Sequence, residues 1–112
     1  MQLLNALAEI RTAADRPNKV NAVKTDQLVV DVVYFTAGQA QGWFRHPDAD
    51  RILVVLKGEG AVHVEAASPL HLPLQAGVVC LVPRGAWHRV EAKTELVLAQ
   101  AVRFPYKLEE RG

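Results

Sequence analysis

Two histidines lie beside tight turns, where their side chains could bind a metal ion or take part in catalysis. His46 directly precedes a Pro47-Asp48 turn, and His88 ends a turn that follows an apolar run closing at Val82. An imidazole at the end of a strand can bind a divalent metal ion or, when neutral, act as a general base. Strands of a single barrel would bring the two rings together, so we expect one site that contains both.

Arg51 lies between these histidines in the sequence and changes what such a site can hold. A guanidinium has five donors, no acceptor and a charge that persists at ordinary pH. Two unit charges about 4 Å apart interact by about 4 kcal/mol at an effective dielectric of about 20, so an inward-pointing Arg51 opposes a divalent ion. If Arg51 instead turns outward to Asp48, Asp50 or Glu59, a weak two-histidine metal site remains.

The other two histidines are expected at the surface. His63 alternates with Val62 and Val64 and therefore points away from the face that these valines share. His71 lies in the Pro-flanked segment SPLHLPL, which is typical of a loop. We therefore expect neither ring to join the site.

Apolar runs separated by Gly and Pro indicate the elements that position these residues. The runs are rich in β-branched residues, as in LVVDVVYF, and are short. Strands are expected over residues 28–35, 51–57, 61–65, 78–82 and 95–104, and over part of residues 89–92. Pro69 and Pro73 are expected to interrupt the ladder. Short strands at regular spacing predict an all-β sandwich or barrel.

The two ends of the chain differ from this β-rich middle. Leu3, Leu4, Leu7 and Ile10 have helical spacing and predict a short N-terminal helix. Residues 15–24 are polar and contain a proline, which indicates a linker. The chain thus divides into an N-terminal helical segment and linker (1–24), a barrel (25–105) and a charged C-terminal tail (106–112) that we expect to fray.

The stretch from Gly77 to His88 resembles the second motif of the small cupins, a superfamily of double-stranded β-helix, or jelly-roll, barrels. That motif reads G-x5-P-x-G-x-x-H, and Gly77, Pro83, Gly85 and His88 match it. Ala92 stands where the family has a closing asparagine. The resemblance extends over residues 28–104 and implies an RmlC-like jelly-roll fold.

The first motif of the family, G-x5-H-x-H-x(3,4)-E-x6-G, is matched only in part. Aligning the sequence on Gly58 places Arg51 at the glutamate. His46 then occupies the second histidine position and Phe44 the first. Metal-binding cupins hold Fe, Mn, Ni or Zn with three imidazoles and one carboxylate. Of these four ligands, the resemblance leaves only His46 and His88.

Two functions of different class remain open. A binding protein would use Phe44, His46, Arg51 and His88 to favour a small anionic, carboxylate-like ligand. An enzyme would be a metal-dependent dioxygenase, isomerase or decarboxylase, as many cupins are, or a metal-free isomerase with a histidine base. Fold alone does not separate them, so whether a reaction is catalysed stays open at this point.

Composition limits the partners and the compartment. The chain has 112 residues, which suits one domain, and a net charge of +1 with no basic stripe, which argues against nucleic acid. No apolar run approaches the roughly 20 residues of a membrane-spanning helix. The single cysteine, Cys80, and the lack of a signal-peptide pattern predict the reducing cytoplasm.

The strand expected over residues 51–57 is apolar on both of its faces. If Arg51 and Leu53 point inward, then Ile52, Val54 and Leu56 point outward. Either the N-terminal segment covers this outward row or a second subunit does, and the two are compatible. Small cupins commonly dimerise, so we expect a homodimer.

Overall fold

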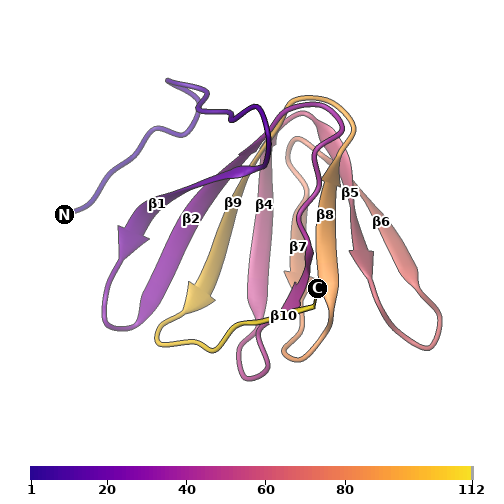
Figure 1. Cartoon of the computed structure of the whole chain (residues 1–112). Coiled ribbons are helices and arrows are strands. Elements are labelled where there is room, and N and C mark those ends of the chain that lie inside the picture. The colour runs from indigo at the N-terminus through magenta and orange to yellow at the C-terminus, as the bar shows by residue number, and fades with distance from the viewer. Residues whose placement is uncertain (112) are drawn as a thin grey trace.

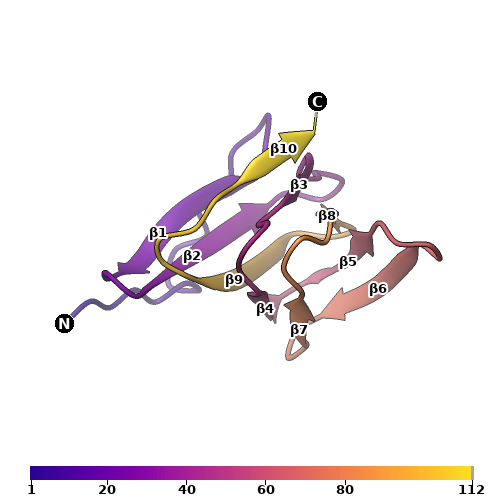
Figure 2. The same cartoon turned by 90° about the horizontal axis from the view of Figure 1, so that it is seen from below.

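The chain folds into two five-stranded antiparallel β-sheets that face each other. This computed structural model describes residues 1–111. The first sheet runs in the order β1 (Asn18–Lys24), β2 (Leu28–Phe35), β9 (Leu96–Arg103), β4 (Arg51–Lys57) and β7 (Val79–Val82). The second runs β10 (Glu109–Arg111), β3 (Trp43–Arg45), β8 (His88–Ala92), β5 (Glu59–Val64) and β6 (Leu70–Gln75). Figures 1 and 2 show the strands and the two layers, and the all-β jelly roll is confirmed.

The predicted N-terminal helix is wrong. Residues 1–17 form an irregular segment whose only turn centres on Ala6–Ala8. Contacts with the first sheet replace helical hydrogen bonds: the Tyr34 hydroxyl donates to the Ala6 carbonyl oxygen (2.8 Å), and Gln2 bonds to the Lys24 backbone. A short helix is marginal by itself, so such contacts decide its conformation. Within residues 1–111 no helix is long and apolar enough to cross a membrane.

Two segments that were expected to be irregular are edge strands. Residues Asn18–Lys24, expected in the linker, form β1 and pair with β2. Residues Glu109–Arg111, expected in the fraying tail, form β10 and pair with β3. Gly112, the last residue of that expected tail, lies outside the described residues. Both are edge strands and carry several polar or charged side chains, as edge strands commonly do. A search for apolar runs in the sequence therefore does not find them.

Pro73 does not interrupt the second sheet as expected. It lies inside β6, opposite Ala61 of β5. β6 is an edge strand of its sheet, and an edge strand tolerates proline because one of its sides needs no backbone donor.

The barrel interior is apolar toward one end and polar toward the other. The apolar end holds the main core cluster: Val33, Phe35, Leu53, Val55, Val62, Leu74, Val82, Val90, Ala92, Leu96 and Leu98. Further along the same strands, the inward positions carry Asp31, Arg51 and Gln100. Buried apolar area stabilises the first end, while the second is free to hold polar side chains. The polar end is therefore where a ligand site must be sought.

The turn between β4 and β5 accounts for the glycine at the end of the first motif. Gly58 has φ +88°, a conformation that residues with a Cβ rarely adopt. A Cβ there would also collide with the carbonyl oxygen of Glu95. The glycine thus lets β4 turn back tightly against the start of β9.

Candidate functional site

Arg51 points into the barrel and is almost fully buried. It is the first residue of β4 and only 1% of it is exposed. Its Nη1 donates to Nε2 of His88 (2.6 Å), its Nη2 donates to Oε1 of Gln100, and the Phe44 ring lies 4.7 Å from its guanidinium carbon. Burial lowers the pKa of Arg51 to about 9, so the guanidinium is still charged at neutral pH. The inward orientation predicted as one of two alternatives is the one observed.

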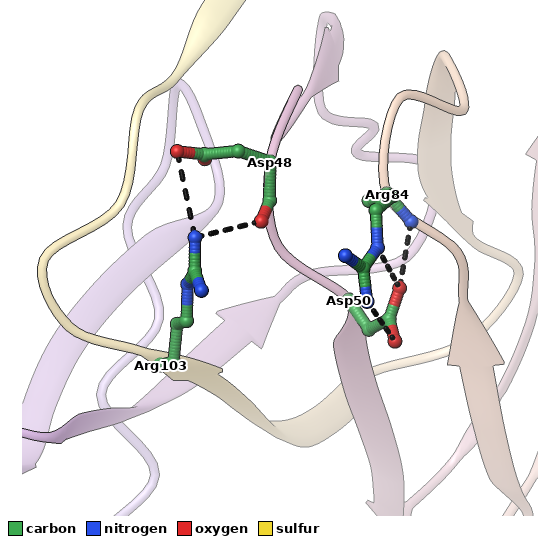
Figure 3. Close-up of polar contacts among 4 residues, drawn as sticks. All are labelled: Asp48, Asp50, Arg84 and Arg103. Atoms are coloured by element: carbon green, nitrogen blue, oxygen red, sulfur yellow. Dashed lines mark hydrogen bonds and ion pairs between the residues drawn. The ribbon is translucent and has the colours of Figure 1, made fainter.

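The neighbouring carboxylates of Asp48 and Asp50 pair with other arginines and not with Arg51 (Figure 3). Arg84 donates to Asp50 through its backbone N–H (2.9 Å) and its guanidinium. Arg103 reaches the Asp48 carbonyl oxygen (2.9 Å) and pairs with its carboxylate. These contacts tie the β3–β4 loop to β9 and to the turn after β7. Arg51 itself points inward because it shares the buried face of β4 with Leu53 and Val55.

His88 is held in a single neutral state. Its Nδ1–H donates to the Ala86 carbonyl oxygen (3.0 Å), so the lone pair lies on Nε2 and accepts from Arg51. Burial, and secondly the Arg51 charge, lower the pKa of His88 to about 4. Its only available lone pair is therefore engaged by a cation at neutral pH.

His46 is also neutral but keeps an unengaged lone pair. Its Nδ1–H donates to the Lys107 carbonyl oxygen (3.1 Å), and no hydrogen bond to its Nε2 is formed within residues 1–111. Burial lowers the pKa of His46, and the Arg51 charge lowers it as well. The hydrogen bond to Lys107 acts in the opposite direction and raises it. The rings of Phe44 and Tyr106 lie edge-on to His46 at 5.9 and 4.9 Å. His46 Nε2 is the free base of the site.

These residues surround one cavity of about 460 Å³ at the polar end of the barrel. Phe44, His46 and Arg51 line it, while His88 lies behind them against Arg51. The rest of the lining is Arg16, Pro17, Lys19, Asp31, Val33, Ala40, Gln41, Gly42, Trp43, Gln100, Val102, Tyr106, Leu108, Glu110 and Arg111. The structure thus brings together the four residues chosen from the sequence, and it adds residues from the start of β1 and from the C-terminal segment to the site.

Sequence reasoning missed several of the polar lining residues. Asp31 had a visible signal, since it is a lone acid in the middle of the apolar strand LVVDVVYF at an inward position. Gln100 sits directly opposite it on β9. Tyr106 had no local signal, because its place depends on how the C-terminal segment returns to β3.

The donor set does not fit the metal site that the first-motif resemblance implies. Phe44 is paired with His88 in the β3–β8 ladder and has no lone pair to offer. The Arg51 guanidinium occupies the Nε2 lone pair of His88, where a metal ion would have to bind. Within residues 1–111, no three His, Cys, Asp or Glu side chains are grouped so as to hold a metal ion.

The remaining two histidines form a pair outside the cavity. His63 of β5 and His71 of β6 face each other in register, with their Nδ1 atoms 2.5 Å apart. His71 belongs to a strand rather than to the expected loop. Two imidazoles can bind a divalent ion weakly at a surface, so metal measurements on this protein need a variant without this pair.

Several solved structures of other proteins share the fold of this chain. A structure of TT1209 from Thermus thermophilus superposes with a TM-score of 0.83 at 22% identity, covering 92% of this chain and 97% of that one. An RmlC-like cupin protein from Desulfovibrio desulfuricans gives 0.80 at 23%, covering 92% and 96%. Oxalate oxidase in complex with the substrate analogue glycolate gives 0.79 at 19%, covering 96% of this chain and 62% of that one.

At these identities the structural likeness shows the fold alone, and no curated protein matches the sequence. A family model described as "Cupin domain" matches residues 31–100, which is more than half of the chain. The chain therefore belongs to the cupin family.

Proposed function

We propose that the protein binds a small anionic molecule, a carboxylate, in the cavity at the polar end of the barrel. The observation that carries this proposal is Arg51: a charged guanidinium, 1% exposed, on the cavity wall, whose Nε–H has no hydrogen-bond partner within residues 1–111. A buried donor without a partner is costly. An acceptor that enters the cavity would satisfy it.

The charge around the cavity supports an anion. Arg51 forms no ion pair within residues 1–111, and its polar partners there are the neutral groups of His88 and Gln100. Four cationic and two acidic side chains line the cavity. Hydrogen bonds from a guanidinium to a carboxylate are about twice as strong as neutral ones. Oxalate oxidase, a protein of the same fold, holds the small carboxylate glycolate.

A second candidate function is a metal-free isomerase with His46 as general base. The observation that favours it is the unengaged Nε2 lone pair of a histidine that is 7% exposed and lines the cavity. A lowered pKa keeps this ring neutral at pH 7, which a proton acceptor requires. The metal-dependent dioxygenase, isomerase or decarboxylase has weaker support, since Arg51 occupies the position of a metal ligand.

Calorimetric titration with matched acids and amides tests the proposal. Wild type is expected to bind acetate and propionate but not acetamide or propionamide. Arg51→Gln removes the charge while its amide can still donate to His88, and it should weaken the acids by about 1.5–3 kcal/mol, roughly 10- to 150-fold. Equal binding of acids and amides, or no loss in a folded Arg51→Gln protein, would contradict the proposal.

A further inference from the structure

Asp31 is a buried carboxylate in the cavity that neither proposed function uses. It lies in β2, is 5% exposed and lines the cavity. The Nδ2 of Asn21 donates to its Oδ1 (3.0 Å), and Asp31 forms no ion pair within residues 1–111. A buried carboxylate is normally paired or heavily hydrogen-bonded, so this one has spare acceptor capacity.

Arg51 does not neutralise Asp31 by direct contact. Gln100 stands opposite Asp31 in the β2–β9 ladder, and its Oε1 accepts from Arg51 Nη2. The two charged groups are close enough for Asp31 to raise the pKa of Arg51, yet an amide side chain separates them. The cavity wall therefore presents one positive and one negative group on either side of the Gln100 amide.

Two buried atoms without a hydrogen-bond partner also combine one donor with one acceptor. The Nε–H of Arg51 is a buried donor and Oε1 of Gln41 is a buried acceptor, and neither has a hydrogen-bond partner within residues 1–111. Both residues line the same cavity. A plain carboxylate supplies acceptors only, so it would satisfy Arg51 but would leave Gln41 Oε1 without a donor and add none to Asp31 beyond Asn21.

We infer that the ligand is a small acid that also carries a hydrogen-bond donor, such as a hydroxy acid or an amino acid, and that Asp31 receives this donor. The inference rests on the proposed function, because Arg51 must take the acid group. Asp31 is then a specificity-determining residue that discriminates between acids of equal size. It does so because a donor reaching its carboxylate forms a charge-assisted hydrogen bond.

Three acids that share a three-carbon carboxylate skeleton test this: propionate without a donor, lactate with a hydroxyl and alanine with an ammonium. Wild type should bind lactate or alanine about 10-fold more tightly than propionate, the worth of one such hydrogen bond. Whichever of the two is preferred identifies the donor. Asp31→Asn should reduce that preference to a few-fold, and Asp31→Leu, which has no acceptor, should abolish it.

The ratio of affinities separates recognition from a structural role, since a general disturbance of the cavity affects all three acids alike. Asp26→Asn is the matched control, because Asp26 is an exposed acid between β1 and β2 and does not line the cavity. It should keep the wild-type ratio. Equal affinities for the three acids in wild type would overturn the inference, and so would a preference for lactate or alanine that persists in Asp31→Leu. Either result would still agree with the proposed binding of an anion. If none of the three binds, the proposed function fails too.

Discussion

Burial, and secondly the charge of Arg51, keep His88 neutral, and this has a measurable effect on stability. The pKa of His88 is about 4 in the folded protein, against 6.5 for an ordinary histidine. As pH falls below 6.5, the unfolded chain binds a proton that the folded protein does not accept until about pH 4. The folded-state pKa is the lower one, so this contribution to stability is present above pH 6.5 and is lost toward pH 4.

We therefore expect the free energy of unfolding to fall between pH 6.5 and 4 by up to about 3 kcal/mol from His88. His46, whose pKa is also lowered, adds to the loss. Urea denaturation at several pH values measures the slope. His88→Gln, which still offers an acceptor to Arg51, should flatten it, whereas His71→Gln is a control outside the cavity. A slope unchanged in His88→Gln would contradict this account.

The metal content of the protein depends on positions 44 and 51. We expect wild type to be purified with substoichiometric metal, because Arg51 opposes a divalent ion and Phe44 cannot ligate one. Phe44→His with Arg51→Glu should restore tight binding, since the Phe44 ring already lies 4.4 Å from the His88 ring and 5.9 Å from the His46 ring. Removing Arg51 also frees the His88 lone pair.

Elemental analysis and calorimetry with Ni²⁺ and Zn²⁺ check this expectation. Both proteins should carry His71→Ala, so that the surface pair with His63 does not contribute. A full equivalent bound by the protein with native Phe44 and Arg51, at submicromolar affinity, would show that the charge argument is wrong. A metal-dependent enzyme would then become the better interpretation.

At the scale of elements, local patterns predicted the strands that pack in the middle of the first sheet. β2 and β4 have the bounds expected from the sequence, Leu28–Phe35 and Arg51–Lys57, and β9 differs by a residue at each end. Their β-branched runs are buried on the inner face, so composition and structure agree. β1, β3 and β10 were missed, because short or polar strands are defined by the partner edge rather than by their own residues. β6 was missed because Pro69 and Pro73 indicate a loop.

The distinction between local sequence patterns and tertiary pairing also explains how much of the site was predicted. Phe44, His46, Arg51 and His88 lie together as the motif spacing suggested, while their roles stay predictions. The residues that close the cavity come from the irregular N-terminal segment and from the return of the C-terminal segment onto β3. Those positions are set by tertiary pairing, which no single stretch of sequence encodes.

At the scale of the whole molecule, the outer face of the first sheet is covered only in part. The N-terminal segment packs on Val32, Tyr34 and Val97, and Leu56 packs on the same cluster. Ile52 and Val54 lie outside that cluster, each between a residue of β7 and one of β9. The paired β7 residues, Leu81 and Val79, are 55% and 66% exposed. An apolar patch therefore continues beyond the segment to the edge of the sheet.

We expect a second copy of the chain to cover this patch in a two-fold symmetric homodimer. Leu81→Glu should favour the monomer without weakening the core, because Leu81 is already more than half exposed in the single chain. Leu70→Glu is the matched control, a leucine of 47% exposure on β6 in the other sheet. Analytical ultracentrifugation at tens of micromolar distinguishes the species. A wild type that sediments only as the 12.3 kDa chain, or a Leu70→Glu protein that dissociates as readily as Leu81→Glu, would rule out an interface on this face.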